Sequence, residues 1–204
     1  MVLRLDQWEE RLPDSVRRIV VRGTHLDGDG AANLRFAYLS VKLLLRRIDL
    51  DKPSSTALGL DVVSHERIRV ESAAEEILYF IQDLEAPQLT DFWLPTTTFT
   101  LASTTTLLLR IALEGQSNVA MVSQSSAFNK AKAMLEALRS HRDSFGWELG
   151  DTCLAQCSEV VDRISTSSQP EVNDAPVDLQ QVFFNEIPFV DDLFPNWWDI
   201  IETS

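Results

Sequence analysis

The chain has 204 residues, 45% of them apolar, and a net charge of −13 at neutral pH. This length is enough to bury one sizeable core but excludes a second complete domain. A balance this acidic also excludes unaided binding to nucleic acid, because phosphate contacts need clustered Lys and Arg and would meet a repulsive field here.

Cysteine content and the first residues bear on the cellular compartment. Only Cys153 and Cys157 are present, too few thiols for a disulfide framework or a four-thiolate zinc site, so we expect two reduced core residues. Residues 1–21 carry charges throughout, so we expect no signal peptide or transmembrane helix there. A reducing intracellular compartment is the consistent interpretation.

The N-terminal segment predicts a short helix followed by an extended strap. Leu5, Trp8 and Leu12 have helical spacing, and Pro13 ends the pattern. We therefore expect residues 17–21 to be extended and to lead the chain into the main domain.

A turn and a long helix come next. Residues 24–33 are rich in Gly and Asp and predict a turn. Apolar residues at helical spacing then predict a helix over residues 31–50, and residues 52–60 interrupt the pattern. The residues with this spacing are Leu34, Ala37, Tyr38, Val41, Leu44, Leu45 and Ile48.

Two helices are predicted in the middle of the chain. One runs from about Ser64 to Glu85 and ends before Pro87. Residues 99–113 are almost continuously apolar and predict a helix that is buried on most sides, the central helix of the domain. The β-branched threonines in and before this segment would also suit strands, so a strand is the alternative there.

Two more helices follow, over residues 125–140 and 147–164, and a polar linker over 165–176. No alternating strand pattern is sustained over several segments, and no βαβ rhythm or internal repeat is present. The sequence therefore predicts an all-α domain over residues 1–165, an irregular bundle of five or six helices.

The last 39 residues, 166–204, form a distinct acidic and aromatic tail, expected to be partly disordered. They contain eight Asp or Glu and six aromatic residues, but no Lys or Arg. This composition is typical of an acidic-hydrophobic activation segment that folds against a partner's groove. The apolar residues that would form one helix face are Phe189, Leu193, Phe194, Trp197, Trp198 and Ile201. The alternative is that these residues dock on the chain's own core as a strap.

Residue patterns that would support catalysis or metal binding are weak. His25, His65 and His141 lie near predicted loops or helix ends, and we expect surface or capping roles for them. The Asp27 segment lacks the ligands of a calcium loop. Asp191 and Asp192 resemble a magnesium-binding aspartate pair, but they lie within the aromatic tail. We therefore expect no catalytic residue, no metal site and no cofactor.

One pocket is conceivable where aromatic residues gather. Phe92, Trp93, Phe99 and Trp147 could line a ligand pocket, and the alternative is that they are ordinary core residues.

Three segments together resemble a known family: LRFAYLSVKLLLRR (34–47), LTDFWLPTTTFTLASTTTLLLRIALE (89–114) and WELGDTCLAQCSEVV (147–161). In this order they are similar to the C-terminal half of the regulatory middle homology region of fungal zinc-binuclear-cluster (Zn2Cys6) transcription factors. The opening LDQWEERLP (5–13) also resembles that family's approach to its long helix. The DNA-binding cluster of six cysteines is absent here, so this chain would not bind zinc or DNA in the family's way.

The resemblance implies a nuclear, non-enzymatic regulatory scaffold whose tail binds a transcriptional coactivator or another transcription factor chain; the cytoplasm is the alternative location. A second hypothesis is an autonomous helical module that senses a ligand or forms homo- or heterodimers and so modulates a full-length factor. A third is an all-α enzyme, which would need a metal-dependent activity that is lost on changing Asp191 and Asp192. No membrane partner is expected.

Overall fold

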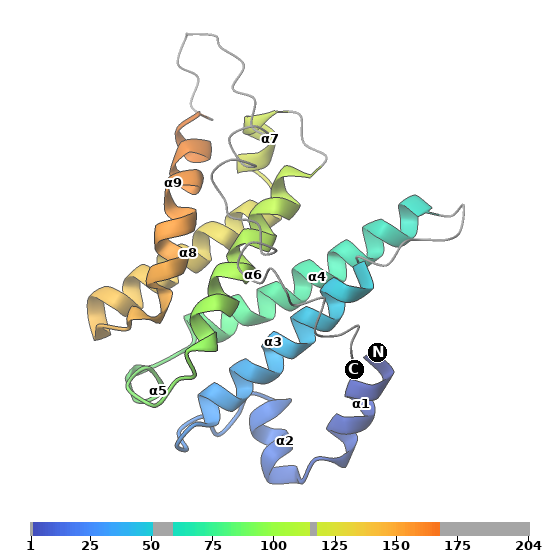
Figure 1. The fold of residues 1–204 in the computed structure, drawn as a ribbon, viewed down its shortest axis with the longest axis vertical. Coiled ribbons are helices and arrows are strands. Elements are labelled where there is room, and N and C mark those ends of the chain that lie inside the picture. Colours follow the sequence, from blue (N-terminus) through green and yellow to red (C-terminus); the bar gives the residue numbers. More distant parts are fainter. Residues whose placement is uncertain (1, 51–58, 115–117, 168–204) are drawn as a thin grey trace, which may run out of the picture.

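The computed structural model describes residues 2–50, 59–114 and 118–167, which fold into nine α-helices and one 3-10 turn, with no strand among them (Figure 1). The predicted all-α class is therefore confirmed. The helices are α1 (Val2–Arg11), α2 (Asp14–Val20), α3 (Ala31–Leu50), α4 (Gly59–Gln82), α5 (Ala86–Leu89), α6 (Thr96–Leu113), α7 (Val119–Ser123), α8 (Ser126–Phe145) and α9 (Asp151–Ser167), and the 3-10 turn is η1 (Glu148–Gly150).

The six longer helices, α1, α3, α4, α6, α8 and α9, correspond to the six segments predicted from apolar spacing. The described residues contain three more helices, α2, α5 and α7, of seven, four and five residues. Segments of one or two turns are too short to show a helical period, and they depend on tertiary contacts for their stability. For this reason the predicted number of five or six helices was too low.

The prediction of an extended strap over residues 17–21 is wrong, because most of this segment belongs to α2. Pro13 ends α1 and also stands at the N-cap of α2, where its fixed φ of −53° is compatible with a helix start. Asp14 places a carboxylate in the first turn of α2, near the positive end of the helix dipole. Val20 is 1% exposed and anchors the far end of this short helix in the core.

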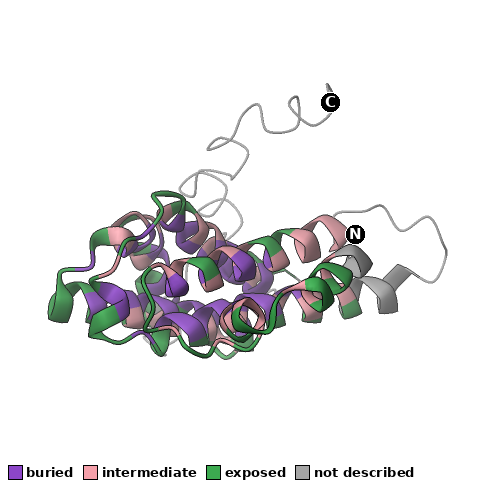
Figure 2. Ribbon diagram, turned by 90° about the horizontal axis from the view of Figure 1, so that it is seen from below, coloured by how far each residue is buried: buried purple, intermediate pink, exposed green. Residues whose placement is uncertain are grey.

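The helices are arranged around α6, as Figure 1 shows in green. α6 packs against α8, α9, α4, η1 and α3, so the prediction of a central helix is confirmed. α3 and α4 lie side by side, and α2 packs against α3. Figure 2 shows buried residues concentrated on the inner faces of the helices.

The threonine-rich segment is helical because its hydroxyl groups are satisfied within the helix. Thr104 and Thr105 are fully buried, and their Oγ1 atoms donate to the carbonyl oxygens of Thr100 and Leu101 at 2.7 Å and 3.0 Å. A buried hydroxyl that bonds to the carbonyl four residues earlier costs little, so β-branched residues are tolerated at these positions. The strand alternative for this segment is excluded.

Both ends of α8 are capped, and a tight turn joins its C-terminal end to α9. At its start, Ser125 caps α8 by accepting a hydrogen bond from the amide of Phe128 at 3.2 Å. Gly146 ends α8 with a φ of 67°, which favours glycine. α9 then continues to Ser167, so the helical region extends two residues past the predicted boundary at 165.

Candidate interaction surface

A cluster of aromatic residues closes the core between α3, α4, the segment after α5 and η1. The ring centroids of Trp93 and Trp147 are 5.4 Å apart. The Trp93 centroid also lies 5.9 Å from that of Phe36 and 6.4 Å from that of Phe80. All four residues are buried, and the Trp93 indole donates to the carbonyl oxygen of Gln88 at 2.9 Å. Edge-to-face contacts of this kind are typical of a packed core.

Of the four residues predicted to line a pocket, the structure brings only Trp93 and Trp147 together. The side chains of Phe92 and Phe99 are 66% and 45% exposed. The alternative of ordinary core residues therefore describes Trp93 and Trp147, whereas Phe92 and Phe99 belong to the surface.

His141 is also part of this core, so the expectation of a surface or capping role is wrong for it. Its side chain is 7% exposed, and its Nε2 atom lies 2.6 Å from the carbonyl oxygen of Ile81. Its ring contacts Trp147 at a centroid distance of 5.9 Å. His25 and His65 are exposed, in agreement with the expectation.

Two loops are fastened together beside the aromatic cluster. The Gln88 side chain donates to Asp27 at 3.1 Å, and the amide of Gly30 donates to Asp91 at 2.6 Å. These bonds join the Gly- and Asp-rich turn before α3 to the segment around α5. The Gly- and Asp-rich turn therefore has a structural function here.

An open cleft of about 470 Å³ lies next to this junction, between the turn before α3 and the C-terminal part of α4. Several ionic side chains that line it already have partners within the chain. Arg35 donates to the carbonyl oxygens of Val20 and Val21, and Glu76 pairs with Lys42 at 2.6 Å. Burial lowers the pKa of Arg35 from its usual value. Both of these side chains are therefore already engaged within the chain.

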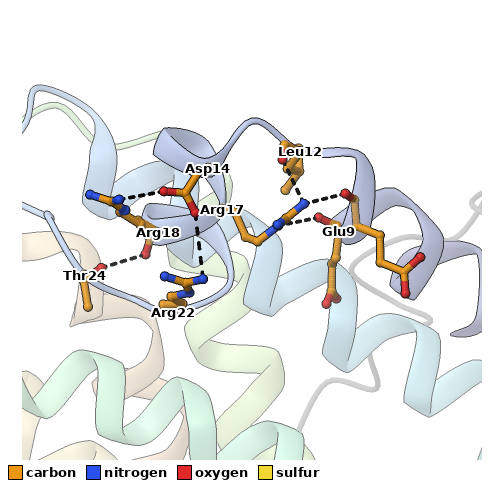
Figure 3. A network of polar contacts seen from close by, with 8 residues as sticks. Glu9, Leu12, Asp14, Arg17, Arg18, Arg22 and Thr24 are labelled. Carbon is orange, nitrogen blue, oxygen red and sulfur yellow. Dashed lines mark hydrogen bonds and ion pairs between the residues drawn. The ribbon is translucent and has the colours of Figure 1, made fainter.

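The N-terminal helices form a hairpin that is held by Arg17 (Figure 3). The guanidinium group of Arg17 donates to the carbonyl oxygens of Glu9 and Leu12 at 3.0 Å each, and also to that of Glu10. Glu9 and Glu10 belong to the last turn of α1, and Leu12 directly follows it. The Glu9 carbonyl also accepts from the Leu12 amide at 3.3 Å, and a helix end leaves other carbonyls without an intrahelical donor. Arg17 thus caps α1 from the neighbouring helix.

The hairpin rests on α3 through Tyr38. The Tyr38 hydroxyl donates to the Glu9 carboxylate at 2.6 Å, and the Trp8 ring stacks on the Tyr38 ring at 6.3 Å. Burial and the hydrogen bond to Glu9 raise the pKa of Tyr38 well above its usual value. Trp8 itself remains 45% exposed, at the edge of the outer face of α3.

That outer face is the most unusual feature of the described residues, because α3 is apolar on two opposite sides. Phe36, Leu39 and Leu43 face the core and are 6% exposed or less. A second set of apolar residues lies on the opposite side of a helix with about 3.6 residues per turn. This set, here called the α3 stripe, consists of Leu34, Ala37, Val41, Leu44 and Ile48.

The α3 stripe is accessible over most of its length. Leu34, Val41 and Leu44 are 46%, 47% and 43% exposed, and Ala37 and Ile48 are half-buried. Near the N-terminal end of α3, the backbone amide of Leu94 donates to the Asn33 side chain at 3.4 Å, and the Leu94 side chain is 41% exposed. A large apolar surface of this kind on a folded domain marks a site of contact with another macromolecule. We therefore take the α3 stripe as the candidate interaction surface.

The sequence shows that α3 carries apolar residues at helical spacing, but it does not show whether these residues face the core or the solvent. The residues of the stripe were identified from their helical spacing, but a helical period does not show which side of a helix faces the core. The second apolar set on the same helix was the clue, since a helix that is apolar on both sides needs a second partner.

The two cysteines that the sequence predicts to be core residues lie within the described part of the chain. Cys153 and Cys157 are free and fully buried, and the Cys153 thiol donates to Thr105 at 3.1 Å. The contact with Cys157 and burial raise the pKa of Cys153. The described ranges contain no group of three or more metal-ligating side chains and no helix long and apolar enough to cross a membrane.

The tail residues proposed to bind a coactivator lie outside the residues that the structure describes. The same holds for the aspartate pair discussed above. The residues concerned are Phe189, Leu193, Phe194, Trp197, Trp198, Ile201, Asp191 and Asp192.

Searches against protein-family models, curated proteins and solved structures found no match to this chain.

Proposed function

We propose that this chain is a non-enzymatic transcription regulator of the fungal zinc-binuclear-cluster type, in which a helical scaffold presents surfaces for other proteins and the acidic tail binds a coactivator. The observation that carries the proposal is the α3 stripe, an apolar surface on the side of a core helix that faces away from the core. Such a surface serves protein contacts.

The arrangement of the resembling segments supports the same proposal. Residues 34–47 lie in α3, residues 89–114 include α6, and residues 147–161 form η1 and most of α9. α6 packs against each of the other elements, so the three segments meet in one body. Segments that carry a family resemblance are expected to be neighbours in space when they encode one shared scaffold.

The composition of residues 166–204 supports the coactivator part of the proposal. Its eight carboxylates are interspersed with aromatic residues, and it contains no cation. A coactivator with a hydrophobic groove and a basic rim would bind both kinds of side chain. In this proposal the protein acts in the nucleus and reaches DNA only through a partner chain.

The experiment that tests the coactivator part is a reporter assay with residues 166–204 fused to an unrelated DNA-binding domain. The proposal predicts activation by the intact tail. It also predicts loss of activation when Phe194, Trp197 and Trp198 are all changed to Ala, since these side chains would fill the groove. A second variant replaces Asp174, Asp178 and Glu186 by Asn or Gln, which removes charge but keeps the aromatic residues. It should weaken activation, because the basic rim of the coactivator would lose its partners. No activation from the intact tail would contradict this part of the proposal.

A second candidate function is a dimerising module that modulates a full-length factor by sharing its interface. The regular spacing of the α3 stripe favours this function specifically. It is compatible with the first, because the scaffold and the tail would act through different surfaces.

A further inference from the structure

We draw no further inference here: the strongest candidate, the exposed apolar face of α3 that the α3 stripe forms, is an unpartnered surface, and nothing in the part of the chain that the structure describes shows what covers it.

Discussion

At the scale of single residues, Phe92 and Trp93 are adjacent in the sequence but have opposite environments. Trp93 is 9% exposed, contacts three other aromatic rings and donates to the Gln88 carbonyl, whereas Phe92 is 66% exposed. The buried ring stabilises the fold, while the exposed ring is available to the surroundings. Trp93 is therefore a core residue, and the exposed Phe92 does not line a pocket together with it.

Trp93→Ala is expected to lower the free energy of unfolding by about 3–5 kcal/mol, because it removes a large buried side chain and leaves a cavity. Phe92→Ala should change it by no more than about 0.5 kcal/mol, since little buried area is lost. Urea denaturation followed by circular dichroism would measure both values. Equal losses for the two variants would contradict the assigned environments.

Lys130 on α8 forms the least exposed ion pairs described in the structure. Its Nζ atom lies 2.8 Å from Glu71 and 3.3 Å from Glu75 on α4. Burial alone would raise the pKa of Glu71, but the hydrogen bonds from Lys130 and Ser126 and the charge of Lys130 outweigh burial, so the pKa lies below 4.5. Burial likewise opposes the charge of Lys130, and the bonds to Glu71 and Glu75 raise its pKa above 10.5.

Because the pKa of Glu71 is lower in the folded state, its contribution to stability is fully present above pH 4.5 and is lost as the pH falls through the folded-state value. At neutral pH, Glu71→Gln should therefore be less stable than the wild type by about 1–2 kcal/mol. The difference should shrink on acidification. Urea denaturation over a pH series would measure it, with the exposed Glu136→Gln as the control.

At the scale of secondary-structure elements, α1 depends on a residue outside itself. The carbonyl groups at its C-terminal end accept hydrogen bonds from Arg17 of α2, and its residues Trp8 and Glu9 contact Tyr38 of α3. A helix of ten residues has little stability of its own in water. Its position is therefore determined by these few contacts.

Arg17→Ala is expected to lower the free energy of unfolding by about 1–2 kcal/mol and to speed amide hydrogen exchange in residues 2–11, because carbonyl groups of α1 lose a charged donor. The control is Arg18→Ala. Arg18 pairs with Asp14 at 2.7 Å, but both side chains are about half exposed. Such a pair contributes about 1 kcal/mol at most. Unchanged exchange in α1 after loss of Arg17 would contradict its capping function.

The elements also show which parts of the fold were predictable. The six longer helices follow from apolar spacing, because each buries a continuous stripe. α2 does not follow from the apolar spacing, because Pro13 both ends the pattern of α1 and favours the start of the next helix. The outward direction of Leu34 and Val41 was not predictable from spacing alone. It depends on where α2 and α4 pack against α3, which is a tertiary property.

The candidate site was predictable to a smaller extent for a similar reason. Aromatic bulk near Trp93 and Trp147 correctly indicated two residues that meet in space, but Phe99 lies on the exposed side of α6. Likewise, His141 lies near a helix end in the sequence, and this position does not predict that its ring contacts Trp147 across the turn at Gly146.

At the scale of the whole molecule, the chain combines a helical body with a tail of very different composition. The body, residues 1–165, has a net charge of −5, and residues 166–204 add −8 without a single cation. The body presents an apolar stripe on α3, and the tail supplies carboxylates and aromatic residues. The proposed function assigns the first to contact between chains and the second to coactivator binding.

The most direct test of the central claim is a reporter assay with the whole chain, residues 1–204, fused to an unrelated DNA-binding domain. The proposed function predicts transcriptional activation that is lost when Phe194, Trp197 and Trp198 are changed to Ala. Phe92→Ala serves as a matched control for loss of an exposed aromatic side chain outside the tail, and it should retain activation. An intact chain that is expressed and folded but gives no activation, or activation that persists in the triple variant, would contradict the claim.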